Sequence, residues 1–186
     1  MRIVGGAWRG RRLAAPAGGG VRPTSDRARE ALFNILENAS AFADLDIAGA
    51  VVVDAFAGTG ALGLEALSRG AALALFLESD ADALAVLRRN LDSVGARARA
   101  RAYPLDATQP GRAPEPCDLA FLDPPYGADL AGPALSALAA GGWLKPGAVA
   151  VVELARRDAF DAPDGFAAVD ERVYGAARLV FLRCAE

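Results

Sequence analysis

Residues 51–67, VVVDAFAGTGALGLEAL, constrain the fold more than any other stretch of this chain. They begin with an apolar run without polar alternation, which is typical of a parallel strand that is covered on both faces. Gly58, Gly60 and Gly63 permit a tight turn, and the apolar residues that follow recur at helical spacing. The stretch therefore predicts a buried strand that passes through a glycine turn into a helix, the repeating unit of an open α/β sheet.

The alternation of strand and helix continues towards the C-terminus. Repeated strand–helix units imply a parallel sheet joined by right-handed crossovers. The last segment differs, because two apolar runs meet at Tyr174-Gly175 without an intervening helix, and we expect an antiparallel hairpin there. The sequence thus predicts an α/β fold with a mostly parallel sheet of seven strands. After the first unit, the expected elements are strands at 73–79, 98–106, 117–123 and 147–154, helices at 80–95 and 129–141, and the hairpin over 166–183.

The N-terminal part differs from this α/β body. Residues 1–23 mix short apolar pieces with glycine and arginine, which indicates a basic β-hairpin arm, and residues 24–186 form the second predicted domain. Thr24, Ser25 and Asp26 supply capping side chains for an amphipathic helix over 27–39. Residues 1–30 carry a charge of +5 in a chain of net charge −3, which leaves −8 for the rest. Such a basic arm directs an anionic partner to one end of the molecule.

Composition excludes several classes of protein. The chain of 186 residues has no histidine, which removes Ser-His-Asp, Cys-His and His-metal chemistry. Cys117 and Cys184 lie far apart without a C-x-x-C spacing, so we expect two free thiols in a reducing cytosol and neither a disulfide nor a zinc site. No apolar run reaches the length of a membrane span, and the first residues lack the apolar centre of a signal peptide. We therefore expect a cytoplasmic protein without a membrane or metal partner.

The glycine turn suits two kinds of adenosine cofactor, a nicotinamide dinucleotide and S-adenosylmethionine. Glu78 ends the second predicted strand, where its carboxylate can accept hydrogen bonds from a ribose diol, but both cofactors contain that diol. Asp54 discriminates between them, because its carboxylate would repel a pyrophosphate and attract the ammonium and sulfonium groups of the methyl donor. The residues favour S-adenosylmethionine. Glycines that serve only helix–strand packing are the remaining alternative.

A second motif, FLDPPYG at 121–127, follows an apolar strand at the sheet edge where open α/β folds bind their ligands. Asp123 and the carbonyl of Pro124 can accept both N–H groups of an exocyclic amine on a base, while Pro125 stiffens the loop and Tyr126 stacks on the base. No histidine base is needed, because the proton is readily lost once the methyl has been transferred. Positioning and electrostatics would then carry the catalysis. The alternative is a plain turn with an aromatic plug.

Taken together, five stretches resemble the bacterial 16S rRNA guanine-N2 methyltransferases of the RsmD type: MRIVGGAWRGRRL, RPTSDRAREALFNIL, DAFAGTGALGLEALSRGA, FLDPPY and the late YG. The similarity covers nearly the whole chain, including the basic arm. The resemblance implies a Rossmann-like class I methyltransferase fold with helices on both faces of the sheet, and S-adenosylmethionine as the donor that leaves as S-adenosylhomocysteine. It also implies that the partner is 16S rRNA within a small ribosomal subunit or assembly intermediate. We expect the enzyme to be a monomer.

The same resemblance assigns roles to single residues. Glu78 would bind the ribose hydroxyls, and Asp106 would reach the adenine amino group. Arg22 and Thr24 lie in the segment that closes over the active site in the family, where they would contact the cofactor, cap a helix or bind a phosphate. The target-base pocket would be Asp123, Pro124, Pro125 and Tyr126, and the methionine end of the donor would face Asp54, Phe56, Ala57, Gly58, Thr59 and Gly60.

The arm fits RNA binding through phosphate contacts and base stacking, although a solvated hairpin is the alternative. Methylation of DNA at adenine N6 or cytosine N4 uses the same D-P-P-Y chemistry, but the chain has no insertion for target recognition. A non-catalytic rRNA-binding assembly factor is disfavoured because both halves of the site are intact. A nicotinamide oxidoreductase is disfavoured because nothing in FLDPPYG suits hydride transfer. The predicted RNA-binding residues are Arg2, Trp8, Arg9, Arg11 and Arg12.

Overall fold

The computed structural model describes residues 1–15 and 26–185 of the chain. Its helices are α1 (Asp26–Asn38), α2 (Ala61–Ser68), α3 (Ala81–Val94) and α4 (Ala131–Ala140), with short 3-10 turns η1 (Gly6–Trp8), η2 (Ser40–Phe42) and η3 (Arg97–Arg99). Its strands are β1 (Val51–Ala55), β2 (Leu73–Leu77), β3 (Ala100–Tyr103), β4 (Cys117–Leu122), β5 (Leu144–Ala155), β6 (Phe166–Tyr174) and β7 (Ala177–Cys184).

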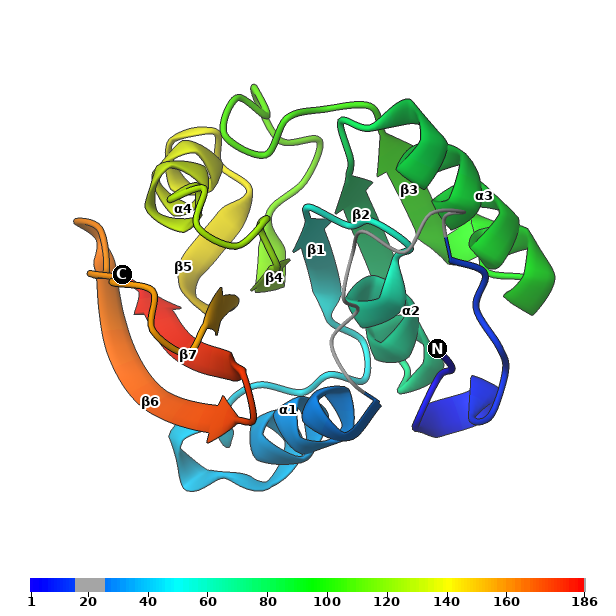
Figure 1. Ribbon diagram of the computed structural model, residues 1–186, viewed down its shortest axis with the longest axis horizontal. Coiled ribbons are helices and arrows are strands. Elements are labelled where there is room, and N and C mark those ends of the chain that lie inside the picture. Colours follow the sequence, from blue (N-terminus) through cyan, green and yellow to red (C-terminus); the bar gives the residue numbers. More distant parts are fainter. Residues whose placement is uncertain (16–25, 186) are drawn as a thin grey trace.

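The seven strands form one sheet in the order β3-β2-β1-β4-β5-β7-β6 (Figure 1). Strands β1 to β5 run parallel to one another. Strand β7 pairs antiparallel with β5, and β6 pairs antiparallel with β7. The predicted mostly parallel sheet with a C-terminal hairpin is therefore confirmed. Strand order reverses between β1 and β4, and such a reversal opens a crevice for ligands at the carboxyl edge of an α/β sheet.

Helices cover both faces of the sheet, as expected. One core cluster joins buried residues of α1, α2 and α3 to alternate residues of the strands, among them Val52, Phe76 and Phe121. The second cluster joins α4 to the other face through residues such as Val53 and Leu122. Figure 1 shows α4 well apart from α1 and α2. The helix after β1 and the helix after β4 thus leave on opposite faces, which keeps the space above the two strand ends open to ligands.

The structure corrects some predicted boundaries. Strand β3 ends at Tyr103 rather than at 106, because Pro104 cannot donate a ladder hydrogen bond. Helix α4 starts at Ala131 rather than at 129, because Asp129 has a φ of 49°, outside the helical region. Helix α3 is close to the prediction: the Asp80 side chain accepts a hydrogen bond from the Ala83 N–H, and Gly95 ends the helix with a φ of 74°.

Residues 1–15 fold back on themselves as a short irregular hairpin, with η1 near its tip. Arg2 and Arg12 form an antiparallel bridge, and the Leu13 N–H donates to the Met1 carbonyl over 3.1 Å. Ile3 and Leu13 are buried in the same core cluster as α2 and α3. The basic arm is thus tied to the body by apolar packing. Within the described ranges, no helix is long and apolar enough to cross a membrane.

Candidate active site

The carboxyl ends of the parallel strands bring the predicted motifs to one edge of the sheet. Ala55, the last residue of β1, lies in register with Leu77 of β2 and with Leu122 of β4. The residues that follow these three strand ends are the glycine turn, Glu78 and Asp123. The structure therefore brings the two halves of the predicted site together, although Asp123 lies 45 positions after Glu78 and still further from the glycine turn.

The glycine turn is held to the end of β2 by hydrogen bonds from its backbone N–H groups. The Gly58 N–H donates to Glu78 Oε2 over 2.7 Å, and the Ala57 N–H donates to the Leu77 carbonyl over 3.0 Å. Glu78 Oε1 accepts a second hydrogen bond, from the Asp80 N–H over 2.8 Å. Glu78 therefore fixes the turn with the same carboxylate that is predicted to bind the ribose.

Glycine is found at the three positions of the motif for different structural reasons. Gly60 has a φ of 79°, and a Cβ there would lie 2.3 Å from Leu87, so the turn excludes other residues at this position. Gly63 lies inside α2, where a Cβ would come within 2.4 Å of the Phe76 ring. Gly58 has a φ of 54°, and a Cβ there would meet only the Phe56 carbonyl oxygen, at 4.0 Å. The packing explanation for the glycines thus accounts for Gly63, whereas at Gly58 the backbone conformation favours glycine and packing does not.

Asp54 is the most perturbed acid at this edge. Its side chain is buried, and Oδ2 accepts a hydrogen bond from the Gly63 N–H in the first turn of α2 over 2.8 Å. Burial raises the pKa of Asp54 to about 8, the charge of Glu78 adds to that rise, and the Gly63 N–H opposes it. A cation bound nearby would favour the ionised form, which is the electrostatic match expected for a sulfonium donor.

Asp106 follows β3 on the same side and is exposed. Its Oδ1 accepts hydrogen bonds from the N–H and the hydroxyl of Thr108, each over 2.8 Å. The carboxylate thus stabilises its own loop, and its exposure leaves it open to an amino group. Arg22 and Thr24, the other predicted cofactor contacts, lie outside the described residues.

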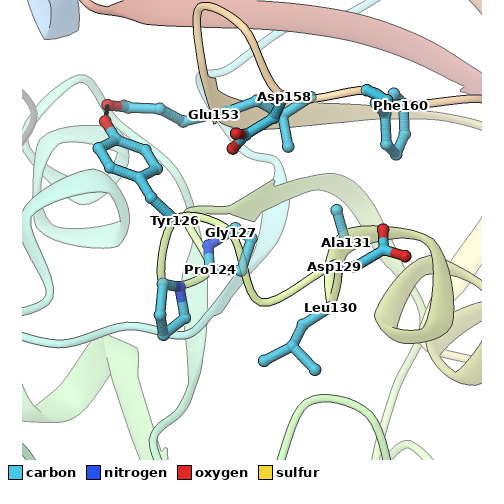
Figure 2. Close-up of a pocket in the computed structure, with 12 residues that line it drawn as sticks. Pro124, Tyr126, Gly127, Asp129, Leu130, Ala131, Glu153, Asp158 and Phe160 are labelled. Atoms are coloured by element: carbon cyan, nitrogen blue, oxygen red, sulfur yellow. Dashed lines mark hydrogen bonds between the residues drawn. The ribbon is translucent and has the colours of Figure 1, made fainter.

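The D-P-P-Y loop lines a cavity of about 260 Å³ together with the start of α4 and the segment after β5 (Figure 2). Pro124 is buried, whereas Tyr126 is 46% exposed. Asp123 is half-buried and is not among the residues that line this cavity. Phe160 supplies a second aromatic ring on the opposite side in Figure 2. Two aromatic side chains and a proline loop are walls suited to a planar base.

Sequence reasoning missed Glu153 as a member of this cavity. The Tyr126 hydroxyl donates to Glu153 Oε1 over 3.1 Å, and Figure 2 shows the two groups meeting at one side of the cavity. Glu153 is 3% exposed and follows a run of apolar residues in β5. A charged residue near the end of a doubly covered strand breaks the apolar pattern, and that break was the available signal.

The predicted RNA-binding residues lie on the arm in different environments. Arg9, Arg11 and Arg12 are exposed. Arg2 forms an ion pair with Asp26 over 3.2 Å. Trp8 is half-buried, and the Arg99 guanidinium lies 5.3 Å from the centre of its ring. Three arginines are thus presented to solvent for an anionic partner, whereas Trp8 packs against the body with a cation already on one face.

Nothing in the described part of the chain forms a group of three or more His, Cys, Asp or Glu residues that would hold a metal ion. Cys117 and Cys184 are free thiols, and burial raises the pKa of Cys117 to about 12. The candidate site thus consists of carboxylates, backbone amides and aromatic rings.

Comparison with known proteins gives one family and several relatives. The family model described as Conserved hypothetical protein 95 matches residues 1–183. The chain is 36% identical over 180 residues to Ribosomal RNA small subunit methyltransferase D of Haemophilus influenzae, which covers 94% of this chain and 89% of that protein. It is 41% identical over 157 residues to the protein of the same name from Escherichia coli, with 82% and 74% covered.

Solved structures agree in fold over the whole chain. The structure of yhhF from Escherichia coli superposes with a TM-score of 0.82 at 37% identity, and the match covers 100% of this chain and 98% of that one. A structure from Haemophilus influenzae superposes with a TM-score of 0.79 at 31% identity, over 100% and 99% of the two chains. The arm, the sheet and the C-terminal hairpin thus all have counterparts in these proteins.

Proposed function

The chain belongs to the Conserved hypothetical protein 95 family, that of the RsmD-type methyltransferases, and from this premise we propose that it methylates a guanosine of small-subunit ribosomal RNA at N2, with S-adenosylmethionine as donor. The observation that carries the proposal is the meeting of the glycine turn, Glu78 and the D-P-P-Y loop at one edge of the sheet. At that edge a donor bound at the glycine turn would lie beside a base bound at the D-P-P-Y loop.

The donor half consists of residues that suit the parts of S-adenosylmethionine. Glu78 would accept hydrogen bonds from the ribose hydroxyls, and the exposed Asp106 would accept one from the adenine amine. Gly58 leaves space for close approach of the ligand to the turn, and Asp54 would offer negative charge towards the methionine end. When bound, the donor supplies an electrophilic methyl carbon on a cationic sulfur.

The acceptor half would prepare the amine for attack. Asp123 and the Pro124 carbonyl would accept the two N–H groups of N2 and turn its lone pair towards the methyl carbon, while Tyr126 stacks on the base. The new N–C bond would form as the S–C bond breaks and its electron pair remains on the sulfur, and the methylated nitrogen would then lose one proton to solvent water. Asp123 would stabilise the positive charge that develops on this nitrogen.

The arm favours RNA as the partner. Residues 1–23 would form the RNA-binding part, residues 24–186 the methyltransferase domain, and the exposed Arg9, Arg11 and Arg12 would contact phosphates. The target guanine must leave its stack to reach the cavity, which costs least in a loop of a partly or fully assembled subunit. We propose a cytoplasmic enzyme that acts as a monomer with this arm.

The test is transfer of label from radiolabelled S-adenosylmethionine to three substrates in parallel: small ribosomal subunits that lack the modification, deproteinised rRNA and duplex DNA. The labelled product is digested and its nucleoside identified. We expect N2-methylguanosine, mainly from the subunits. Label in N6-methyladenosine or N4-methylcytosine of DNA would overturn the RNA assignment, and donor binding without any transfer would favour an assembly factor.

A further inference from the structure

Asn90 occupies an unusual position between the arm and the glycine turn. It lies on α3, is 2% exposed, and hydrogen-bonds to two segments that are far from it in sequence. Its Oδ1 accepts from the Ala14 N–H over 2.8 Å, and its Nδ2 donates to the Ala14 carbonyl over 3.1 Å. The same Nδ2 donates to the Thr59 carbonyl over 2.9 Å. One buried amide thus binds Ala14 of the arm and Thr59 in the glycine turn.

The geometry uses the amide group fully. An asparagine amide has two N–H donors and an acceptor oxygen, and here both donors and the acceptor can be engaged. The pair of bonds to Ala14 copies the way a neighbouring strand would hold that residue, although Ala14 belongs to no strand. No charged or aliphatic side chain could replace both the donor and the acceptor. A role in which Asn90 only fills space in α3 does not require this arrangement.

The arm is also fixed near its start, at Val4 and Gly5. Glu65 of α2 is fully buried and accepts from the Val4 N–H over 2.8 Å and from the Gly5 N–H over 2.7 Å. Ser68 donates to the Gly5 carbonyl over 2.6 Å. Gly6 lies so close to α2 that a Cβ would come within 1.9 Å of the Ser68 carbonyl oxygen. The arm is thus hydrogen-bonded to the body at two places, to α2 at Val4 and Gly5 and to α3 at Ala14.

We infer that Asn90 is a positioning residue that couples the RNA-binding arm to the donor-binding turn. RNA that binds the docked arm stabilises the contact of Ala14 with Asn90, and this keeps the Thr59 carbonyl and the turn in place. The donor then binds a turn that is already ordered, so RNA and donor raise each other's affinity by the same factor. The identity of the two ligands rests on the proposed function, whereas the link between arm and turn rests on the hydrogen bonds of Asn90.

The test compares Asn90→Asp with wild type. Aspartate keeps the shape and the acceptor for the Ala14 N–H, but it turns lone pairs towards the Ala14 and Thr59 carbonyls. Affinity for S-adenosylhomocysteine is measured by calorimetry, with and without modification-free small subunits, and thermal unfolding reports the fold. In wild type we expect subunits to raise this affinity at least about fivefold. In Asn90→Asp we expect the RNA-free affinity to fall about tenfold and the effect of the subunits to vanish.

Val94→Ala is the matched control, because Val94 lies one turn further along α3, is buried, and leaves the hydrogen bonds of Asn90 in place. It should lower the unfolding temperature and leave both affinities as in wild type. If Asn90→Asp changes the RNA-free affinity no more than Val94→Ala does, Asn90 is merely structural and the inference is wrong. A wild-type affinity that subunits do not change would also overturn it. Failure of the proposed function is seen separately, as absence of methyl transfer to subunit RNA by wild type.

Discussion

On the proposed donor side of the sheet edge, Asp54 is buried against α2, and the Glu78 carboxylate accepts a hydrogen bond from the Gly58 N–H of the glycine turn. On the proposed acceptor side, Tyr126 is 46% exposed on a loop beside a cavity. Hydrogen bonds fix the donor side: one joins β1 to α2, and another joins the glycine turn to the residue after β2. The acceptor side draws on β4, β5 and the segment after β5. This contrast predicts that the donor side recognises its ligand in a preformed geometry and that the base completes the acceptor side.

The largest expected effect separates the two sides at Asp123. We expect Asp123→Ala to lower the rate of methyl transfer about 10³-fold, because a preorganised acceptor at the reacting amine is lost. The affinity for S-adenosylhomocysteine should stay within about twofold of wild type, since removal of a transition-state interaction leaves ligand binding unchanged. Single-turnover transfer and calorimetry measure the two quantities.

Asp129→Asn is the matched control, because Asp129 is an exposed carboxylate of the same loop that lines the cavity beside Tyr126, and Asn tolerates its positive φ. It should keep most of the wild-type rate. If Asp123→Ala weakens donor binding as strongly as it slows transfer, Asp123 belongs to the donor side and the contrast is drawn in the wrong place.

The second effect concerns Asp54 and tests whether the donor side is already formed before the ligand binds. Its pKa is about 8 in the folded protein against an ordinary value of 3.8. Between these values the folded state keeps a proton that the unfolded state has released, so the free energy of unfolding should fall as pH rises from about 4 to about 8. We expect Asp54→Asn to remove most of this fall. Urea unfolding at several pH values measures it.

The donor sharpens this test. Saturating S-adenosylmethionine should flatten the fall in unfolding free energy more than S-adenosylhomocysteine does, because only the former has a cationic sulfur that favours ionised Asp54. Equal effects of the two ligands would mean that Asp54 supports α2 without facing the sulfur. A pH dependence that persists in Asp54→Asn would assign it to other groups.

The third effect concerns the arm and should leave the donor side untouched. We expect the triple change of Arg9, Arg11 and Arg12 to Ala to weaken RNA binding about 10²-fold at moderate salt and to lower the salt slope by about 2, because each phosphate contact to single-stranded RNA contributes about 0.7 to that slope. Filter binding over a salt series measures both. Arg172→Ala, on the outer strand β6, is the control and should keep the wild-type slope. An unchanged slope in the triple variant would show that the RNA binds another face of the protein.

Much of this arrangement could be predicted from local sequence. The order of strands and helices from 51 to 184 follows from apolar runs, capping residues and glycines, and each of these signals acts over a few residues. Both motifs of the site were found because open α/β sheets bind ligands after the carboxyl ends of their strands. The meeting of Glu78 with Gly58 follows from the same rule.

The polar contacts between distant segments could not be predicted. Glu65 bonds to Val4 across 61 residues, Asn90 to Ala14 across 76, and Tyr126 to Glu153 across 27. Each of these pairs depends on which faces the tertiary fold brings together, and periodicity does not carry that information. Glu65 and Glu153 did leave a local trace as charged residues in apolar surroundings. No local pattern around Trp8 indicates its contact with Arg99, which only the tertiary fold creates.

The smallest expected effect probes what holds the acceptor side together. Tyr126→Phe keeps the ring but removes the hydroxyl that donates to Glu153 over 3.1 Å. We expect kcat/KM for RNA to fall about fivefold, because one half-exposed hydrogen bond contributes about 1 kcal/mol. Glu153→Gln keeps an acceptor for the hydroxyl and should lose less. If the bond positions the ring, Glu153→Ala and Tyr126→Phe together should cost less than the sum of their separate losses, and donor affinity should not change. Fully additive losses would mean that the two side chains act independently, and that the acceptor loop gains its order from the bound base.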